Sequence, residues 1–249
     1  LYGLPKQTVE SFARSIEQAI SLSPDRLVTF SYAHVPWINK RQLILEKSGL
    51  PDNREKRNMF DTAAKLLLES GYQSIGMDHF VRPNDELSIA MQTKKLHRNF
   101  QGYCTRRTTA QVYGLGVTAI SQLESAYAQN TKDILHYIET IGKGELCITK
   151  GYALSPTEQL TREVIETLMC NGCIDWKALS NRLHVSVPTL KAATAYDEQK
   201  LSVFANDGLI YYTDDYLEMT TEGSAFVRNV AASLDKLMLH TPHSYSKPL

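Results

Sequence analysis

His97-Arg98-Asn99-Phe100-Gln101-Gly102-Tyr103 is the segment in which side chains able to bind a ligand are most concentrated. It interleaves cationic, amide and aromatic groups. A guanidinium such as that of Arg98 can hold a carboxylate through paired hydrogen bonds, and Phe100 or Tyr103 can stack on a flat ring. Composition alone favours a solvated loop with one buried aromatic residue over a binding segment.

A second candidate, Gly76-Met77-Asp78-His79-Phe80, precedes Arg82. It places a carboxylate, an imidazole and a guanidinium just beyond an expected strand. Adjacent residues in a strand point in opposite directions, so Asp78 and His79 need not act together. Taken alone, they are expected to be satisfied loop residues rather than catalysts.

The four cysteines are too few and too scattered for the disulfide framework of a small secreted protein, which favours a reducing compartment. Cys170-x-x-Cys173 has the spacing of metal ligands, but no second cysteine pair or histidine pair accompanies it. We expect two structural cysteines at the end of a helix.

Gly114-Leu115-Gly116 lacks the third glycine of a dinucleotide-binding motif and follows no clear strand. A phosphate cradle is therefore not expected. The small residues either allow backbone to approach a ligand or simply pack closely.

Strands and helices alternate at the start of the chain. A helix capped by Thr8 has apolar residues at helical spacing, a strand is expected over 27–32, a helix over 54–70 and a short strand over 74–77. This order predicts parallel strands joined by crossover helices, as in the last strands of a barrel. Ligands of such folds bind at the carboxyl ends of strands, here Tyr2-Gly3, Tyr32-Ala33-His34 and Asp78-His79-Phe80.

Residues 81–150 carry weaker signals. They predict a short helix over 86–92, an irregular polar and aromatic stretch over 97–109, an apolar segment over 113–120 and a helix over 132–141. Periodicity assigns no fold to this stretch.

From residue 155 the pattern becomes mainly helical. Ser155-Pro156-Thr157-Glu158 is a capping box with proline at the first helical position. Further helices are expected after Asp175, within 189–204 and over 222–239, with a two-stranded hairpin at 209–220. This order resembles a winged-helix module, but 8 basic against 12 acidic residues in 151–249 oppose DNA binding.

The composition is that of an ordinary soluble protein. The 249 residues are 43% hydrophobic and 22% charged, and contain neither a signal peptide nor a long apolar run. Residues 1–150 carry 19 basic and 15 acidic residues, a mild bias that suits an anionic ligand. We expect a cytoplasmic protein, and the leucine at position 1 suggests that part of it lies upstream.

Several segments together resemble the oxygen-independent coproporphyrinogen III oxidases, the HemN family. They are Tyr2-Gly3-Leu4-Pro5-Lys6-Gln7-Thr8, Pro24-Asp25-Arg26-Leu27, Tyr32-Ala33-His34, Ile75-Gly76-Met77-Asp78-His79-Phe80, Leu96-His97-Arg98-Asn99-Phe100-Gln101-Gly102-Tyr103 and Gly114-Leu115-Gly116-Val117-Thr118-Ala119-Ile120-Ser121. The match covers essentially the whole chain. Related haem chaperones have an Asn-Tyr-Trp-like sequence in place of the 97–103 segment, so the oxidase is favoured, with a haem chaperone lacking oxidase activity as the alternative.

The resemblance implies an α/β fold. Residues 1–125 would form the last strands and helices of a partial TIM-type radical S-adenosylmethionine barrel, residues 126–239 a winged-helix-like carboxy-terminal domain and residues 240–249 a tail. It also implies oxidative decarboxylation of two propionates of coproporphyrinogen III to give protoporphyrinogen IX in haem synthesis. S-adenosylmethionine and a [4Fe-4S] cluster would supply a 5′-deoxyadenosyl radical.

The family's S-adenosylmethionine contacts fall on Ala33 and Ile120, and its active-site positions on Phe100 and Gln101. Arg98 is expected to pair with a substrate carboxylate. The family's Cys-x-x-x-Cys-x-x-Cys motif is absent, so no metal ligand is expected here and the chain alone should be inactive. The electron donor and acceptor are not identified; neither nucleic acid nor a membrane is an expected partner, and the full-length protein should be a monomer.

Overall fold

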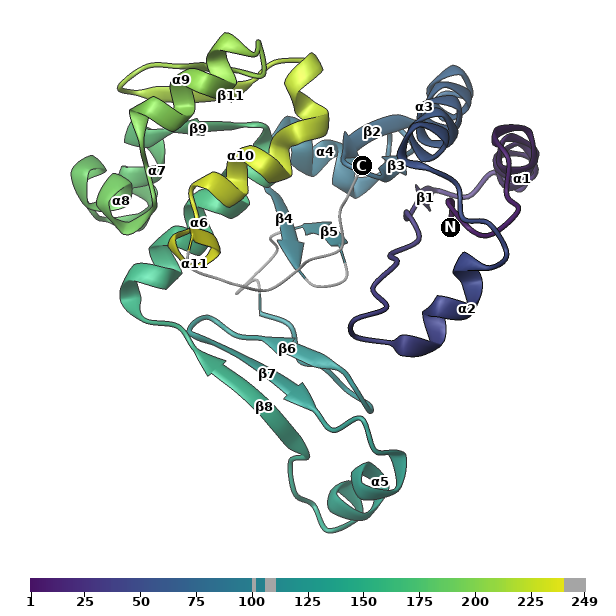
Figure 1. Cartoon of the computed structure of the whole chain (residues 1–249). Helices are drawn as coiled ribbons and strands as arrows, with labels where there is room; N and C mark the ends of the chain where they lie inside the picture. The colour runs from purple at the N-terminus through teal and green to yellow at the C-terminus, as the bar shows by residue number, and fades with distance from the viewer. Residues whose placement is uncertain (100–101, 106–110, 240–249) are drawn as a thin grey trace. The chain divides into compact units, whose positions relative to one another are not determined.

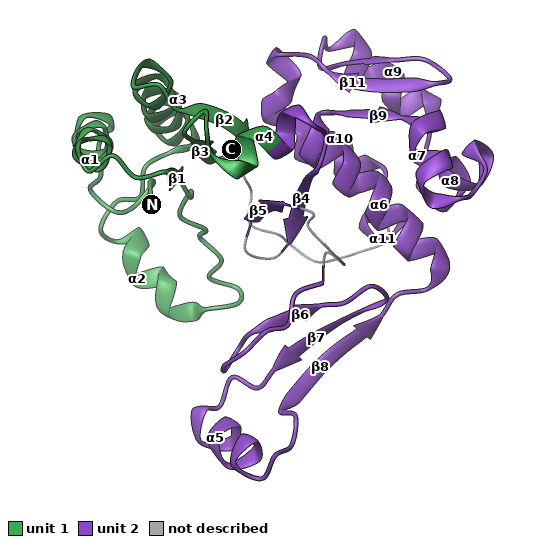
Figure 2. Ribbon diagram, turned by 180° about the vertical axis from the view of Figure 1, so that it is seen from behind, with its two compact units in different colours: residues 1–89, 241–249 green, residues 90–240 purple. Residues whose placement is uncertain are grey.

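The computed structural model describes residues 1–99, 102–105 and 111–239. They form two compact units, residues 1–89 and residues 90–240 (Figure 2). The expected division at residue 125 rests on the family resemblance and stays a prediction. None of the helices in the described residues is both long and apolar enough to cross a bilayer.

The first unit is built around two packed helices, α1 (Val9–Ser21) and α3 (Asn53–Glu69). α1 begins as predicted, because the Thr8 side chain accepts a hydrogen bond from Ser11 N and the Ser11 side chain caps Thr8 in return. The core between helices and sheet consists of buried apolar side chains: Tyr2, Phe12, Ile16, Met59, Ala63, Leu67, Tyr72 and Phe80. The predicted periodicity of both helices is confirmed.

The sheet of the first unit is antiparallel, with strand order β1-β3-β2. β1 (Arg26–Val28) and β2 (Gln73–Gly76) each pair antiparallel with β3 (His79–Val81), so they run in the same direction without pairing with each other. Direct parallel pairing of these two strands was therefore the wrong prediction. A parallel bridge does join Tyr2 to Ser31, where Tyr2 N donates to Phe30 O at 2.9 Å. Positive φ angles at Gly76 and Met77 allow the chain to turn back into β3, which sequence periodicity did not indicate.

Three shorter helices complete the elements of residues 1–95: η1 (Lys40–Gln42), α2 (Leu43–Glu46) and α4 (Glu86–Gln92). The bounds of α4 are those predicted. Asp85 begins the turn into α4, because its Oδ1 accepts a hydrogen bond from Leu87 N at 2.7 Å and its Oδ2 one from Arg26 Nε at 2.8 Å.

The second unit opens with an antiparallel strand pair, β4 (Leu96–Asn99) and β5 (Gly102–Thr105). Arg98 pairs with Tyr103, and His97 with Cys104. Most of the segment predicted as a solvated irregular loop is therefore paired strand, and both His97 and Tyr103 are buried. The prediction failed because His97 and Tyr103 form hydrogen bonds with groups of α6, more than sixty residues further along the sequence.

A second sheet follows, with order β6-β7-β8: β6 (Ile120–Gln122), β7 (Ala126–Asn130) and β8 (Ile148–Ala153). The helix α5 (Ile134–Gly142) connects β7 to β8 and lies at the end of this sheet (Figure 1). α5 confirms the helix predicted over 132–141. Its Asp133 cap accepts a hydrogen bond from His136 N at 3.0 Å.

The rest of the second unit is helical around a small antiparallel sheet of order β10-β11-β9. Its elements are α6 (Pro156–Asn171), β9 (Cys173–Asp175), α7 (Trp176–Leu183), α8 (Val187–Ala193), α9 (Glu198–Asn206), β10 (Ile210–Tyr212), β11 (Tyr216–Met219), η2 (Glu222–Phe226), α10 (Val227–Ser233) and α11 (Lys236–Leu239). The capping box at Ser155 and the hairpin are confirmed. The single helices predicted within 189–204 and over 222–239 are divided, the first at Thr194, whose backbone is extended.

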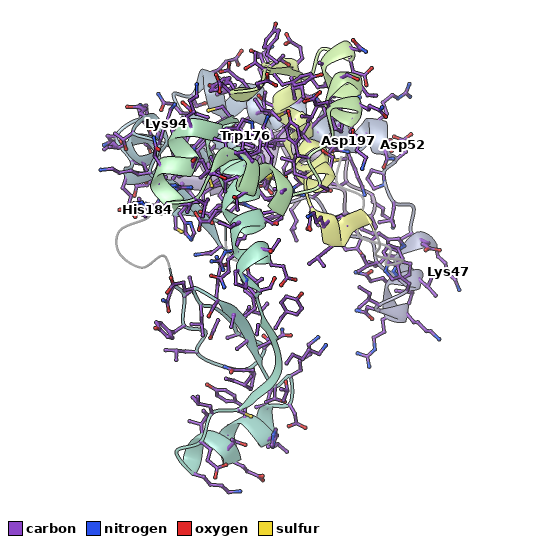
Figure 3. The ribbon with its side chains drawn as sticks, turned by 90° about the vertical axis from the view of Figure 1, so that its left-hand side faces the viewer. Lys47, Asp52, Lys94, Trp176, His184 and Asp197 are labelled. Carbon is purple, nitrogen blue, oxygen red and sulfur yellow. The ribbon has the colours of Figure 1, made fainter. Side chains whose placement is uncertain are left out.

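Trp176 forms the centre of this helical part (Figure 3). Its side chain is fully buried, and its ring lies edge-on to Tyr196 with 5.7 Å between the ring centroids. Lys191 Nζ lies 4.3 Å from the Tyr196 ring centroid and 5.6 Å from the Trp176 ring, so this charge is held against two aromatic faces. Leu168, Leu190 and Leu217 of the same helical part are also fully buried.

Candidate functional site

A pocket of about 310 Å³ lies within the second unit, where one face of α6 meets β4 and the β6–β7 hairpin. Its walls combine two guanidiniums, a carboxylate, two amides, a phenol and two apolar side chains: Arg98, Asn99, Gln122, Tyr127, Arg162, Ile165, Glu166 and Met169. The α6 members recur at three and four residues, so the period of the helix puts them on one face. Gln122 and Tyr127 are cross-strand partners, which places both side chains at the same level of the hairpin.

Two side-chain contacts join β4 and β5 to α6 and fix this corner of the pocket. The Tyr103 hydroxyl donates a hydrogen bond to Met169 O at 3.0 Å. His97 Nδ1 and Glu166 Oε1 form a hydrogen bond between side chains that are 3% and 12% exposed. Because both contacts span more than sixty residues of sequence, the pocket exists only in the folded unit.

The two pocket arginines have different roles. Arg162 donates from Nη1 to Leu123 O at 3.1 Å and from Nη2 to Glu124 O at 2.6 Å, so its guanidinium holds the turn between β6 and β7. Arg98 Nε is buried and has no hydrogen-bond partner among the described residues. Its guanidinium carbon lies 5.6 Å from the Tyr103 ring centroid. The Nε–H group of Arg98 is therefore available to donate a hydrogen bond to a ligand.

A carboxylate is the chemical group that this arrangement suits. A buried polar donor without a partner costs roughly 1–3 kcal/mol, which a bound acceptor recovers. A planar guanidinium binds carboxylates with two parallel hydrogen bonds. Ile165 and Met169 offer apolar contact to the rest of such a ligand.

Ala33 and Ile120, the predicted S-adenosylmethionine contacts, lie in different units. Ala33 O accepts a hydrogen bond from Gln42 Nε2 at 3.2 Å. Ile120 begins β6, and its backbone lies against Gly114. The shared cofactor site stays a prediction, and Phe100 and Gln101 lie outside the described residues.

Gly114 is glycine because of close packing. A methyl group at this position would lie 2.8 Å from both the carbonyl carbon and the oxygen of Ile120. Of the two explanations for the small residues of this segment, close packing is confirmed at Gly114. Gly116 has no neighbour within 4 Å of such a methyl group, and instead has a φ of +98° that favours glycine.

Asp78 and His79 lie in direct contact, which their positions in the sequence did not by themselves require. His79 Nδ1 is 2.8 Å from Asp78 Oδ1, and the buried imidazole lies edge-on to Phe30. Thr29 N donates to Asp78 O at 2.9 Å. His79 belongs to β3 rather than to a loop, so this pair helps to fix the turn between β2 and β3.

Cys170 and Cys173 are buried, one in the last turn of α6 and the other at the start of β9, which confirms their predicted place at a helix end. Within the described residues no group of three or more His, Cys, Asp or Glu side chains is placed to hold a metal ion. These residues therefore do not fit an iron–sulfur cluster.

Four polar residues of the pocket were not singled out from the sequence: Gln122, Tyr127, Arg162 and Glu166. A signal existed for two of them. Arg162 and Glu166 are four residues apart on a helix whose buried positions are Thr161, Val164, Leu168 and Cys170. Charged residues that close to the buried side are candidates for a polar site.

Residues 154–226 match the family described as the HemN C-terminal domain. The chain is 37% identical over 249 residues to the oxygen-independent coproporphyrinogen III oxidase of Helicobacter pylori strain 26695, covering 100% of this chain and 54% of that protein. It is 37% identical over 235 residues to the Escherichia coli protein of the same name, covering 94% of this chain and 50% of that protein.

A solved structure gives the same result. The coproporphyrinogen III oxidase HemN from Escherichia coli, described as a radical SAM enzyme, superposes with a TM-score of 0.84 at 37% identity and covers 95% of this chain and 54% of that chain. The chain thus spans about half the length of the curated relatives that it matches. The predicted resemblance and the α/β fold are confirmed.

Proposed function

We propose that this chain, a relative of the oxygen-independent coproporphyrinogen III oxidases, is the part of such an enzyme that binds a propionate of coproporphyrinogen III. The observation that carries the proposal is Arg98, whose buried Nε has no hydrogen-bond partner among the described residues and lines a pocket of about 310 Å³. The substrate presents the carboxylates that such a guanidinium recognises.

The pocket residues would bind and orient this substrate. Arg98 would take one carboxylate through two of its N–H groups. The amides of Asn99 and Gln122 and the Tyr127 hydroxyl could donate further hydrogen bonds, and Met169 would pack against the pyrrole edge. Holding one propionate fixes the position of the others. Orienting a flexible substrate in this way raises the rate of its reaction.

In the full-length enzyme, oxidative decarboxylation of two propionates would yield protoporphyrinogen IX. S-adenosylmethionine and a [4Fe-4S] cluster would supply the radical chemistry, with the cluster ligands outside this chain. Ala33 and Ile120 are proposed to contact S-adenosylmethionine, and Phe100 and Gln101 to lie at the reacting propionate. The chain's own part is to bind the substrate and to exclude water from it.

The two parts of the chain are proposed to have different roles. We propose that residues 1–125 complete a radical S-adenosylmethionine barrel and that residues 126–239 form a winged-helix-like domain. The helix–strand–helix–helix order of α6, β9, α7 and α8, with the β10–β11 hairpin after the further helix α9, supports the winged-helix part of this proposal. With 8 basic and 12 acidic residues in 151–249, this domain would serve packing at the site rather than DNA binding.

An anaerobic assay of the full-length protein tests the function. The protein is reconstituted with iron and sulfide and supplied with S-adenosylmethionine, a reductant, an electron acceptor and coproporphyrinogen III, and the tetrapyrroles are separated by chromatography. Protoporphyrinogen IX is the expected product. Release of 5′-deoxyadenosine without this product, together with tight haem binding, would instead establish a haem chaperone.

A further inference from the structure

Three consecutive residues of the first unit, Tyr32, Ala33 and His34, each carry a polar group that is left without a hydrogen bond. The Tyr32 hydroxyl and His34 Nδ1 are buried and have no partner in the described part of the chain. Ala33 is exposed, and no described residue accepts a hydrogen bond from its N–H group. A buried polar group without a partner costs roughly 1–3 kcal/mol, so several such groups side by side indicate a place where a ligand binds.

The backbone of this segment is nevertheless fixed. Tyr32 N donates a hydrogen bond to Tyr2 O at 2.7 Å, which ties the segment to the parallel bridge. Beyond Tyr32 the Gln42 side chain takes over: its Oε1 accepts a hydrogen bond from Val35 N at 2.7 Å, and its Nε2 donates to Ala33 O at 3.2 Å. A side-chain amide has the same acceptor and donor as a peptide group of a neighbouring strand. One side chain therefore holds Ala33 and Val35 as a paired strand would.

A second side chain from the same short helical segment holds His34. Gln42 is the last residue of η1 and Glu46 the last of α2, and residues four apart lie on one face of a helix. Glu46 Oε1 lies 2.8 Å from His34 Nε2, so the carboxylate orients the ring and leaves Nδ1 without a partner. Gln42 and Glu46 thus fix the backbone and a side chain of the same segment.

We propose that Gln42 is a positioning residue that sets the direction of the Ala33 N–H group and so presents it to an acceptor atom of the ligand. This inference rests on the proposed function, in which Ala33 contacts S-adenosylmethionine, and adds to it the residue that fixes this contact. The peptide group between Tyr32 and Ala33 lies between two anchors, Tyr32 N and Ala33 O, which restrict its rotation. A donor fixed in advance loses less conformational entropy when it binds.

Gln42→Glu tests this role with a side chain of the same size. The variant keeps an acceptor for Val35 N, but it loses the donor and places a carboxylate oxygen against Ala33 O. At about pH 8 the Kd of the full-length protein for S-adenosylmethionine, measured by equilibrium dialysis, should rise about tenfold, the worth of one hydrogen bond. Gln18→Glu, at an exposed position of α1, makes the same change of charge and should bind as the wild type does.

The pH dependence of Gln42→Glu separates positioning from general damage to the fold. A neutral carboxylic acid has one accepting and one donating oxygen, as the amide has. The facing Ala33 carbonyl oxygen raises the pKa of the introduced carboxyl above its ordinary value of about 4.3. The deficit relative to the wild type at the same pH should therefore shrink to within about threefold at about pH 5. His34 and Glu46 are present in both proteins, so their titration is common to both. An equal deficit at both pH values, or none at about pH 8, overturns the inference.

Hydrogen exchange tests the Gln42 contacts without the ligand. Gln42→Leu removes both hydrogen bonds, so the Val35 amide of the full-length protein should exchange about tenfold faster or more in the absence of S-adenosylmethionine. Unchanged exchange at Val35 overturns the inference. Failure of the wild-type protein to bind S-adenosylmethionine would count against the proposed function, and the exchange of Val35 would still test whether Gln42 holds this segment.

Discussion

Gly114→Ala tests whether the segment before β6 is held as closely as the structure indicates. The new methyl group would lie 2.8 Å from the carbonyl carbon and oxygen of Ile120 and 2.9 Å from its nitrogen. All three atoms are backbone, so no flexible side chain can move aside. The segment is also fixed by hydrogen bonds, from Gly114 N to Ser121 Oγ at 2.9 Å and from Asn130 Nδ2 to Gly114 O at 3.1 Å.

The expected cost follows from this geometry. Inserting a methyl group where the backbone must shift destabilises a fold by about 1–3 kcal/mol. In a unit of this size each kcal/mol lowers the Tm by roughly 2–4 °C. The backbone of Ile120 would be displaced too, so the same variant should weaken S-adenosylmethionine binding in the full-length protein if Ile120 contacts that cofactor.

Gly142→Ala is the matched control. A methyl group there would have no neighbour within 4 Å. Gly142 is the last residue of α5, and its φ is not positive. Alanine favours a helix over glycine by up to about 1 kcal/mol, so this variant should be as stable as the wild type or slightly more stable. Thermal unfolding of the three proteins followed by circular dichroism provides the measurement. Equal Tm values for Gly114→Ala and Gly142→Ala would refute the packing account.

Two further predictions concern the supports of the pocket and of α6. Tyr103→Phe removes the hydrogen bond to Met169 O and keeps the ring, so urea denaturation should show a loss of about 1 kcal/mol; an unchanged midpoint would mean that this bond does not hold β5 to α6. Hydrogen bonds from the Tyr152 hydroxyl, and next from Ser155, lower the pKa of Glu158 in the folded state. The carboxylate therefore stabilises the fold above its unfolded pKa, and this stability is lost as the pH falls through the lower folded value. Glu158→Gln should be less stable than the wild type at neutral pH and equally stable well below about pH 4; a constant difference across this range would contradict the assignment.

Helices with local start signals were predictable from the sequence, and elements fixed by distant contacts were not. α1 and α6 begin at capping boxes whose partners are three residues apart, so the sequence contains the whole signal. β3 and the β4–β5 pair are short, and depend on the positive φ angles of Gly76 and Gly102 and on partners elsewhere in the fold. Periodicity does not report such contacts.

The candidate site was predictable in its chemistry and not in its geometry. Arg98 was expected to bind a carboxylate because of its residue type and its neighbours. Its partners in the pocket come from β6, β7 and α6, and Glu166 is 69 residues away from His97. Only the fold brings these groups together, so the sequence could not indicate that His97 and Arg98 have different partners.

The most direct test of the account is the KM for coproporphyrinogen III of the full-length protein with Arg98→Gln, compared with Arg57→Gln. Arg57 is an exposed residue of α3 paired with Asp61, so its loss should leave KM unchanged. Loss of one charge-assisted carboxylate contact at Arg98 should raise KM by roughly tenfold to a hundredfold. Equal KM values for the two variants would contradict the central claim that Arg98 holds a propionate of the substrate.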